Sequence, residues 1–325
     1  MEKLARQVCS PFGLRPTDRV IEVGSGDGQQ LHYFKSLGTQ VLGIEPSADL
    51  TRVSQEIDVP VVQCLFGHDT IDQIPAEFKP TQAVLLTYTF DHLPEPVPFL
   101  DAVRSILDPV RGIVIIEVHD LEKIMERRET CVFEHEHSIY LHALSMKRLL
   151  ERSGFTLLTT QLLPESERRG NSLLIVAGLT GCIHQPDASA NPTHLEKMDD
   201  WTHYEGFGKA VDASYARMRE HVRTIRRAGG RVAAYGAGGR GVMTLAMSGL
   251  DHADIEFVCD KNEGFRGLLT PKTHIPVVSP QHLLANPVDE VIVFSFGYLA
   301  EIRDELADYL HGGGKLVSLL DVLKS

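Results

Sequence analysis

The sequence predicts an α/β protein of two domains, each built around a mostly parallel sheet. In both halves of the chain, short runs rich in β-branched residues alternate with helix-length segments, and this alternation is typical of parallel sheets covered by helices. Between the halves, the stretch "HQPDASANPT" at 184–193 is rich in proline and small residues, as inter-domain linkers are. We therefore expect one domain at 1–183 and a second at 184–325.

The strand signals of the first half change character toward its end. Strands are expected at 19–24, 40–46, 83–89 and 112–118, and helices at 29–37 and 97–107. Two further apolar runs, 155–163 and 171–179, leave no room for a helix between them. They predict a closing pair of strands in hairpin order.

The second half opens with a helical segment and then repeats the alternation. Residues 194–228 carry helical spacing with many charges and end at Gly229 and Gly230, which is a helix stop signal. The runs "RVAAYG", "IEFVCD", "EVIVFSF" and "KLVSLL" follow as four expected strands. This order predicts a second Rossmann-like α/β domain with a helical lead-in.

The composition argues against several classes of partner. The 325 residues include 32 Lys and Arg against 44 Asp and Glu, a formal charge of −12, so neither nucleic acid nor an anionic membrane is expected as a partner. Five cysteines without a C-x-x-C pair indicate free thiols in a reducing compartment. The sequence shows no signal peptide and no apolar stretch of about 20 residues. We expect a cytoplasmic protein; its oligomeric state is not predicted, and a monomer is compatible with the sequence.

The stretch "VIEVGSGDGQQL" predicts a ligand loop between a strand and a helix. Its glycines let a ligand approach the backbone, although they could also serve only to turn the chain. Asp27 inside the loop disfavours a pyrophosphate and suits a cationic ligand. Glu45 ends the next strand, where a carboxylate can accept the hydroxyls of a ribose. E-x-G-x-G-x-G with a strand-end acid is the pattern of class I S-adenosylmethionine methyltransferases. The expected cofactor contacts are Glu22, Gly24, Ser25, Gly26, Asp27, Gly28, Glu45, Pro46, Ser47, Phe66 and Tyr88.

A second glycine loop, "VAAYGAGGRGVM", has a different charge. Gly236, Gly238 and Gly241 spell G-x-G-x-x-G, and Asp260 follows 19 residues later, which is close to a dinucleotide-binding fingerprint. The loop carries no acid and has Arg240 at the expected helix start, an arrangement that suits a phosphate or diphosphate. Three interpretations stay open: a nucleotide-linked substrate, which we favour, NAD(P), or tight packing without a ligand.

Histidines and carboxylates gather at two places. His92 follows the strand expected at 83–89, so it should stand at the carboxyl edge of the sheet, where ligands bind. The stretch "CVFEHEHSIYLHAL" holds six titratable residues within nine positions: Glu134, His135, Glu136, His137, Tyr140 and His142. A histidine beside a carboxylate is a natural general base. The same residues could bind a metal through H-x-H or could be surface histidines; we predict no metal.

Nearly the whole chain resembles the sugar C-methyltransferases, which methylate carbon 3 of nucleotide-linked 4-keto-deoxysugars. The motifs "VIEVGSGDG", "FEHEHSIYL", "RRGNSLLI", "AAYGAGGRG", "FVCDKNEGFRGLLTPKTHIPV" and "FGYLAEI" occur in the order seen in that family. The resemblance implies a class I (Rossmann-like) methyltransferase domain followed by a second Rossmann-like α/β domain, with S-adenosylmethionine as cofactor. It also implies that the second glycine loop binds the diphosphate of the substrate.

The family's chemistry gives roles to the histidines. His137 matches the histidine of the family's E-H motif and would remove the proton next to the ketone, while Glu136 would orient it or contact the sugar. His92 is a candidate for holding the keto oxygen, and Tyr140 is a further catalytic candidate. The expected substrate contacts are Glu134, Arg169, Asn171, Tyr235, Gly236, Ala237, Gly238, Arg240, Asp260, Thr273, His274 and Tyr298.

The chain departs from the family at several positions. The cysteine-rich zinc module with which the family usually begins is not expected here. Glu134 stands where tyrosine is usual, Arg169 replaces a histidine, Asn171 a glycine and Tyr88 an asparagine. The cofactor motif is intact and the sugar pocket is altered. Three rivals therefore stay open: an O- or N-methyltransferase of another small molecule, an NAD(P)-linked oxidoreductase, and a non-catalytic partner subunit.

Overall fold

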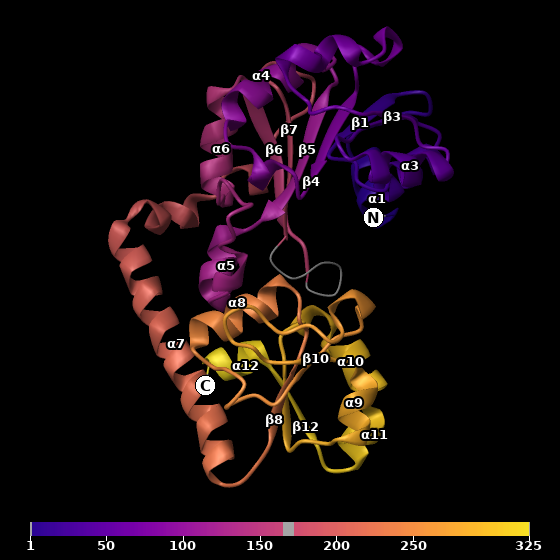
Figure 1. Cartoon of the computed structure of the whole chain (residues 1–325). Helices are drawn as coiled ribbons and strands as arrows, with labels where there is room; N and C mark the ends of the chain where they lie inside the picture. Colours follow the sequence, from indigo (N-terminus) through magenta and orange to yellow (C-terminus); the bar gives the residue numbers. More distant parts are fainter. Residues whose placement is uncertain (1, 165–171, 325) are drawn as a thin grey trace. The chain divides into compact units, whose positions relative to one another are not determined.

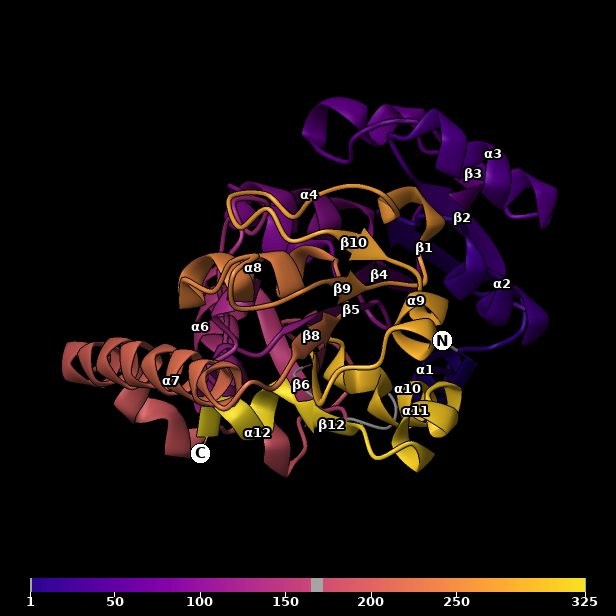
Figure 2. The same ribbon diagram turned by 60° about the horizontal axis from the view of Figure 1, so that its bottom comes forward.

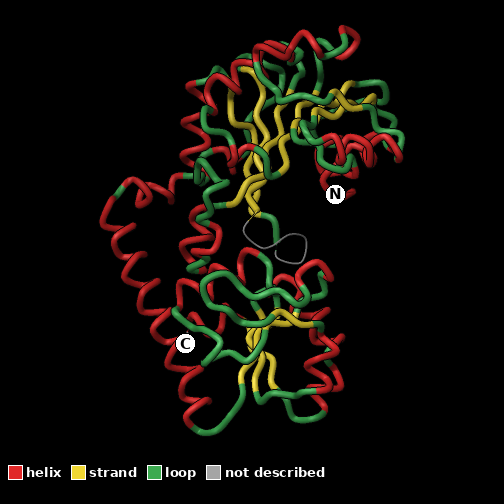
Figure 3. Tube along the Cα trace, in the orientation of Figure 1, coloured by secondary structure: helices red, strands yellow, loops and turns green. Residues whose placement is uncertain are grey.

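A computed structural model describes residues 2–164 and 172–324 of the chain. These residues form two compact units: unit 1 (Met1–Leu121 and His135–Lys197) and unit 2 (Glu122–Glu134 and Met198–Ser325). Strands lie at the centre of each unit and helices lie around them (Figure 3). The predicted α/β fold class is confirmed.

Unit 1 contains a seven-stranded sheet in the order β3-β2-β1-β4-β5-β7-β6. Its strands are β1 (Arg19–Val23), β2 (Gln40–Ile44), β3 (Val61–Val62), β4 (Ala83–Thr87), β5 (Ile113–His119), β6 (Phe155–Leu162) and β7 (Ser172–Leu179). Strands β1 to β5 pair in parallel, whereas β7 runs antiparallel to both β5 and β6. The predicted closing hairpin is therefore confirmed, and the two-residue strand β3 is an addition.

Helices cover both faces of this sheet (Figure 1). They are α1 (Glu2–Cys9), α2 (Gln29–Ser36), α3 (Ala48–Glu56), α4 (Pro96–Ile106) and α6 (Ala143–Arg152). The unit also contains the short 3₁₀-helices η1 (His68–Gln73), η2 (Ala76–Phe78), η3 (Phe90–His92), η5 (Ala188–Ala190) and η6 (Thr193–Asp199). On one face, Leu31 and Phe34 of α2 pack against Ala83 and Leu85 of β4. The alternate strand residues are buried too, so the strands are apolar on both sides, as parallel sheets require.

Unit 2 contains a five-stranded parallel sheet in the order β10-β9-β8-β11-β12. Its strands are β8 (Val232–Tyr235), β9 (Val258–Cys259), β10 (Val277–Val278), β11 (Glu290–Val293) and β12 (Lys315–Ser318). Its helices and turns are α5 (Leu121–Arg127), η4 (Thr130–Val132), α7 (Trp201–Arg227), α8 (Gly239–Ser248), η7 (Glu263–Phe265), α9 (Pro280–Ala285), η8 (Phe296–Tyr298), α10 (Leu299–Glu305), α11 (Ala307–His311) and α12 (Leu319–Lys324). Four of the five strands were predicted, and β10 was not.

Alternating side chains of β8 separate two hydrophobic cores in unit 2. Val232 and Ala234 face the core shared with α7, α8 and α12, whereas Ala233 and Tyr235 face the core shared with α9, α10 and α11. The two sets of helices lie on opposite sides of the strands (Figure 2). Among the described residues, no helix combines the length and apolar character needed to cross a membrane.

The compact units do not coincide with the expected domains 1–183 and 184–325. Residues 122–134 belong to unit 2, because Ile124 and Val132 form a small apolar cluster with Met243 of α8. Arg128 adds polar contacts: it donates hydrogen bonds to Ser214 Oγ at 2.8 Å and to the Leu323 carbonyl at 2.9 Å.

The expected linker at 184–193 is folded against unit 1. The Thr160 amide donates to Ser189 Oγ at 2.8 Å, and the Asp187 amide donates to the Leu158 carbonyl at 2.9 Å. Both contacts involve β6, which is one of the two edge strands of the sheet. Covering an edge strand satisfies backbone groups that would otherwise attract other chains, which explains why this proline-containing stretch is not free. Unit 1 therefore extends to Lys197.

Candidate active site

The first glycine loop connects β1 to α2 at the carboxyl edge of the unit 1 sheet. Gly24, Gly26 and Gly28 adopt φ of 70°, 56° and 77°, a region that L-residues other than glycine rarely enter. At Gly24 the space is also closed, since a Cβ atom would stand 2.5 Å from Thr89 Oγ1. At Gly26 a Cβ would meet nothing within 4 Å. The loop is therefore tight at its start and open in its middle.

The carboxylate of Glu45 braces this loop. Its Oε2 accepts a hydrogen bond from the Gly26 amide at 3.0 Å, and its Oε1 accepts one from the Ser47 amide at 2.8 Å. Glu45 is buried. Each carboxylate oxygen has a second lone pair, so the group can hold the loop and still accept a further hydroxyl.

The remaining residues of the expected cofactor site fit a ligand that carries a ribose and a positive charge. Ser25 Oγ is buried and has no hydrogen-bond partner. Asp27 is exposed, and its Oδ1 accepts from the Gln29 amide at 3.1 Å at the start of α2. Glu22 lies buried in β1, Pro46 follows β2, and Phe66 packs edge-on against Phe99 at 5.1 Å. A buried donor, an exposed acid and an open glycine together suit S-adenosylmethionine.

The turn η3 and the segment 136–139 form the second part of the site. The Asp91 carbonyl accepts hydrogen bonds from the amides of Ser138 at 2.8 Å and Ile139 at 3.2 Å. His92 Nδ1 lies 2.9 Å from the Glu136 carbonyl oxygen, and Ser138 Oγ donates to the His92 carbonyl at 3.3 Å. The turn after β4 therefore fixes the backbone beside His137.

These contacts gather aromatic rings from three segments around His137. The centroid of its ring lies 4.9 Å from that of His92, 5.2 Å from that of His119 and 6.0 Å from that of Tyr140. Three of the four predicted catalytic residues thus lie together, while the carboxylate-bearing Glu136 is exposed. His119, the last residue of β5, is an addition.

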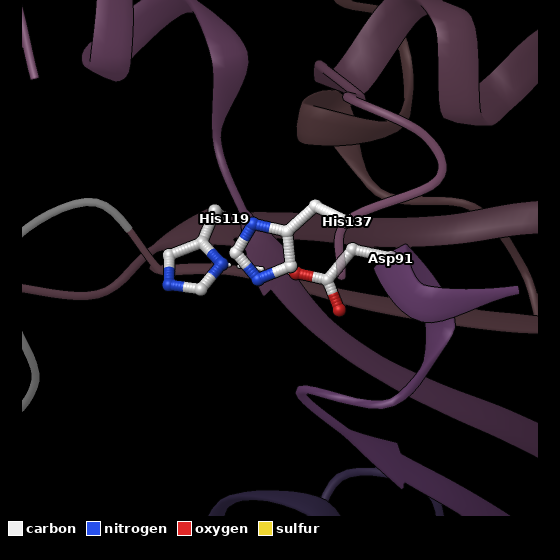
Figure 4. Close-up of side chains that lie close together, drawn as sticks. All are labelled: Asp91, His119 and His137. Atoms are coloured by element: carbon white, nitrogen blue, oxygen red, sulfur yellow. Dashed lines mark hydrogen bonds and ion pairs between the residues drawn. The ribbon is translucent and has the colours of Figure 1, made fainter. Parts of the chain in front are cut away.

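Asp91 is the second addition, and it is the buried acid of the group (Figure 4). Its Oδ2 accepts a hydrogen bond from His119 Nδ1 at 2.9 Å. Burial raises the pKa of the Asp91 carboxyl, but the hydrogen bond from His119 and the charges of the neighbouring histidines outweigh it and hold the pKa below its usual range. Asp91, His119 and His137 offer one oxygen and two nitrogens within 4.8 Å of one another, a spacing that a cation could also use. The hydrogen bond accounts for the Asp91–His119 contact without one.

Tyr88 supports His119 from the turn after β4. It has a positive φ of 52°, its ring centroid lies 4.9 Å from that of His119, and its hydroxyl contacts Ser172 Oγ. The sequence assigned Tyr88 to the cofactor, whereas these contacts place its ring against the histidine cluster.

The second glycine loop, in unit 2, combines packing with an open position. A Cβ at Gly236 would stand 2.4 Å from Ser295 Oγ, and one at Gly241 would stand 2.0 Å from the Gly236 carbonyl oxygen. These two glycines are required by close packing whether or not a ligand binds. Gly238, the N-cap of α8, would meet nothing within 4 Å and is the position at which a ligand could approach.

Charged residues of both signs surround the start of α8. The guanidinium carbon of Arg240 lies 4.3 Å from the centroid of the Phe296 ring, a cation–π contact. The Asp260 carboxylate accepts from the Ala237 amide at 2.6 Å and from the Asn262 amide at 2.8 Å. Glu134 lies against the same helix end, with Oε1 3.2 Å from where a Cβ of Gly239 would stand. An acid at this position opposes an anionic ligand.

Two predicted substrate residues lie away from this loop. Thr273 and His274 were expected near the loop, but Lys272 Nζ donates to the Ala246 carbonyl at 3.2 Å and the His252 amide donates to the Thr273 carbonyl at 3.2 Å. Both contacts are at the carboxyl end of α8, about 15 Å from Gly238 for a ten-residue helix. The expectation that Thr273 and His274 lie near the second glycine loop is wrong. Motifs that follow one another in the sequence can lie at opposite ends of a helix.

Other substrate candidates have mixed outcomes. Tyr235 is buried and its hydroxyl donates to Glu305 Oε2 at 2.7 Å; burial, then this contact, raises the pKa of Tyr235 above its usual range. Tyr298 is exposed at the end of η8. Arg169 and Asn171 lie outside the described residues.

Comparisons with known families cover both halves of the chain. The family model of a methyltransferase domain matches residues 1–160, and that of a C-methyltransferase C-terminal domain matches residues 188–320. The chain is similar to the C-methyltransferase NovU of Streptomyces niveus, with 26% identity over 321 residues that cover 98% of this chain and 76% of that protein.

Solved structures similar to this chain include two methyltransferases. One is 1,6-didemethyltoxoflavin-N1-methyltransferase from Burkholderia thailandensis with bound 1,6-didemethyltoxoflavin and S-adenosylhomocysteine: 17% identity, TM-score 0.40, covering 57% of this chain and 77% of that chain. The other is a SAM-dependent methyltransferase from Archaeoglobus fulgidus: 16% identity, TM-score 0.42, covering 55% of this chain and 94% of that chain.

Proposed function

We propose that this chain, an S-adenosylmethionine-dependent methyltransferase whose second half matches the model of a C-methyltransferase C-terminal domain, methylates a carbon next to a ketone. The proposed acceptor is a nucleotide-linked deoxysugar or a similar small molecule. The observation that carries the proposal is the group of histidines around His137 at the carboxyl ends of β4 and β5. Methylation of oxygen or nitrogen does not need a base for a carbon acid.

The proposed chemistry divides between the cofactor and the protein. S-adenosylmethionine, when bound, supplies a methyl group that is electrophilic because it is attached to a sulfonium. Glu45 and the loop 24–28 would hold it through the ribose and the open backbone at Gly26. The protein's remaining task is to make the acceptor carbon nucleophilic.

His137 has the proposed role of general base. A C–H bond beside a ketone is weakly acidic, and its proton would move to a ring nitrogen of His137 while the bonding electron pair stays with the carbon. That pair forms the new bond to the methyl group as the bond from methyl to sulfur breaks. His92 donates its Nδ1–H to the Glu136 carbonyl. Its Nε2 would therefore donate to the ketone oxygen, where negative charge develops, only when the ring is doubly protonated.

Unit 2 has the proposed role of holding the nucleotide. Gly238 leaves space at the N-terminus of α8, and Arg240 supplies a positive charge in the first turn. Helix N-termini and guanidinium groups both favour phosphate oxygens. Glu134 at the same helix end would have to move away or be compensated when a diphosphate binds.

Deuterium exchange tests the carbon-acid step directly. The enzyme is incubated in deuterated water with S-adenosylhomocysteine and a nucleoside-diphosphate 4-keto-deoxysugar, and proton NMR follows the C–H beside the ketone. We expect exchange in the wild type and none in His137→Ala, whose turnover should also fall by about 10²–10⁴-fold. His135→Ala, an exposed neighbour, is the matched control. A product that carries the new methyl group on oxygen or nitrogen would overturn the proposal.

A further inference from the structure

Asp91 is a buried carboxylate with contacts to three histidines of unit 1. Its Oδ2 accepts a hydrogen bond from His119 at 2.9 Å, while its Oδ1 lies 3.9 Å from His92 Nε2 and has no hydrogen-bond partner. The third histidine is His137, with a ring nitrogen within 4.8 Å of the Asp91 oxygen and of a His119 nitrogen (Figure 4). One negative charge therefore faces three imidazoles.

The same residue also positions the backbone beside the proposed base. The Asp91 carbonyl accepts hydrogen bonds from the amides of Ser138 and Ile139, the two residues that directly follow His137. Asp91 is only 4% exposed, so water competes little for these contacts. Its main chain fixes the segment that carries His137, and its side chain fixes the ring of His119.

The hydrogen bond from His119 determines how the charge of Asp91 can be used. An ionised carboxylate only accepts, so the proton of this bond belongs to His119 Nδ1. A neutral His119 satisfies the bond and leaves the negative charge of Asp91 uncompensated by a full positive charge. The charge is then available to stabilise a second imidazole that gains a proton.

We propose that Asp91 is the positioning residue of the proton-transfer step, which it supports by holding His119 and by stabilising the positive charge that His137 acquires. This inference rests on the proposed role of His137 as base. The proton moves from the acceptor carbon to His137, and Asp91 stays ionised throughout. Among the described residues, titratable groups that face His137 are Asp91, His92, His119 and, from its own segment, Tyr140. Asp91 is the one acid among these four.

The substitution Asp91→Asn removes the charge and keeps the size of the side chain. We expect turnover to fall by about 10²–10⁴-fold, the range for a disabled acid–base group, with unchanged affinity for S-adenosylhomocysteine by calorimetry. The acidic limb of the pH–rate profile should move to lower pH, because the protonated form of the base loses its counter-ion. A merely structural role would not move this limb. Asp101→Asn on α4, which removes an acid paired with Arg104, should leave both turnover and the profile unchanged.

A measurement on the wild type keeps the inference testable if Asp91→Asn does not fold. Nitrogen-15 NMR of the imidazoles above neutral pH should show the neutral His119 with its proton on Nδ1. The opposite tautomer would overturn the inference. So would one equivalent of a bound transition metal whose removal abolishes activity, since Asp91, His119 and His137 would then be its ligands.

The outcomes separate this inference from the proposed function. If His137→Ala remains fully active, the proposed base is wrong whatever Asp91→Asn does. If His137→Ala is inactive while Asp91→Asn keeps wild-type turnover and pH profile, the inference about Asp91 alone fails.

Discussion

The two glycine loops of the molecule are built alike and differ in charge. The first glycine of each donates to the end of the neighbouring strand at 2.8 Å, Gly24 to the Ile44 carbonyl and Gly236 to the Cys259 carbonyl. In each unit a strand-end acid then accepts one amide of the loop and one amide two residues beyond itself, through Glu45 in unit 1 and Asp260 in unit 2. This pair of hydrogen bonds from loop amides to a strand-end carboxylate is thus a property of the fold.

The loops differ in the charged residues that do not take part in these hydrogen bonds. The first loop exposes Asp27, whereas the second carries Arg240 in the first turn of its helix. Glu45 and Asp260 are already engaged with backbone amides, so a strand-end acid does not by itself identify a ligand. If the proposed function is correct, the charge inside each loop is what distinguishes the loop for a sulfonium cofactor from the loop for a substrate with phosphates.

The largest difference in stability is expected between alanine at a tightly packed glycine of the first loop and alanine at the open glycine of the second loop. Gly24→Ala forces a positive φ on alanine and a contact with Thr89, which should cost about 2–5 kcal/mol of the free energy of unfolding. Gly238→Ala enters open space at a φ of −71° and should leave the melting temperature unchanged. Thermal unfolding of both variants measures this. Equal losses would mean that the two loops are packed alike.

Removal of the Glu45 carboxylate should weaken the binding of the cofactor only. Glu45→Ala leaves the amides of Gly26 and Ser47 without their acceptor and removes the proposed ribose contact, so S-adenosylhomocysteine should bind about 1–3 kcal/mol more weakly. Nucleoside diphosphate affinity should stay the same. Isothermal titration calorimetry with each ligand checks both statements, with Glu56→Ala on α3 as an exposed control. Unchanged S-adenosylhomocysteine affinity would remove Glu45 from the cofactor site.

A smaller effect is expected at the positive charge of the second loop. Arg240→Ala should weaken binding of UDP and dTDP about tenfold, since a charge-assisted hydrogen bond contributes about 1.5 kcal/mol. Arg240→Lys should recover part of the loss, and S-adenosylhomocysteine affinity should not change. If instead NAD binds across 236–241 in a soaked crystal, the assignment of this loop to a nucleotide-linked substrate is wrong.

The smallest effect should have the opposite sign. Glu134→Gln removes a negative charge at the N-terminus of α8, so nucleoside diphosphates should bind a few-fold more tightly, as expected for about 0.3–1 kcal/mol of helix-end electrostatics. The gain should shrink at high salt. Weaker binding in Glu134→Gln would show that Glu134 contacts the substrate through its carboxylate rather than opposing the phosphates.

The sequence predicted what depends on local pattern. Strands β1, β4 and β5 were found because each is a run of β-branched residues, and the glycine loops because their spacing is short. Strands β3 and β10 have two residues each, and each follows a proline. The equally short β9 was predicted because it lies within the longer apolar run "IEFVCD". Asp91 and His119 were missed because they are far apart in the sequence. They meet because β4 and β5 are neighbours in the sheet, with Thr87 of β4 opposite Glu117 of β5. The order of strands in a sheet was the missing information, although two polar residues just beyond adjacent parallel strands are a usable signal.

Because residues 122–134 belong to unit 2, the two units cannot be separated by cutting the chain at one place. The chain changes unit after Leu121, after Glu134 and after Lys197, so no single cut yields both units whole. A fragment that stops at Lys197 keeps Ile124 and Val132 but lacks their partner Met243, leaving apolar side chains without cover. A chimera that takes unit 2 from a relative therefore needs two replaced segments, 122–134 as well as the segment after Lys197, because unit 2 is not one continuous stretch of the chain.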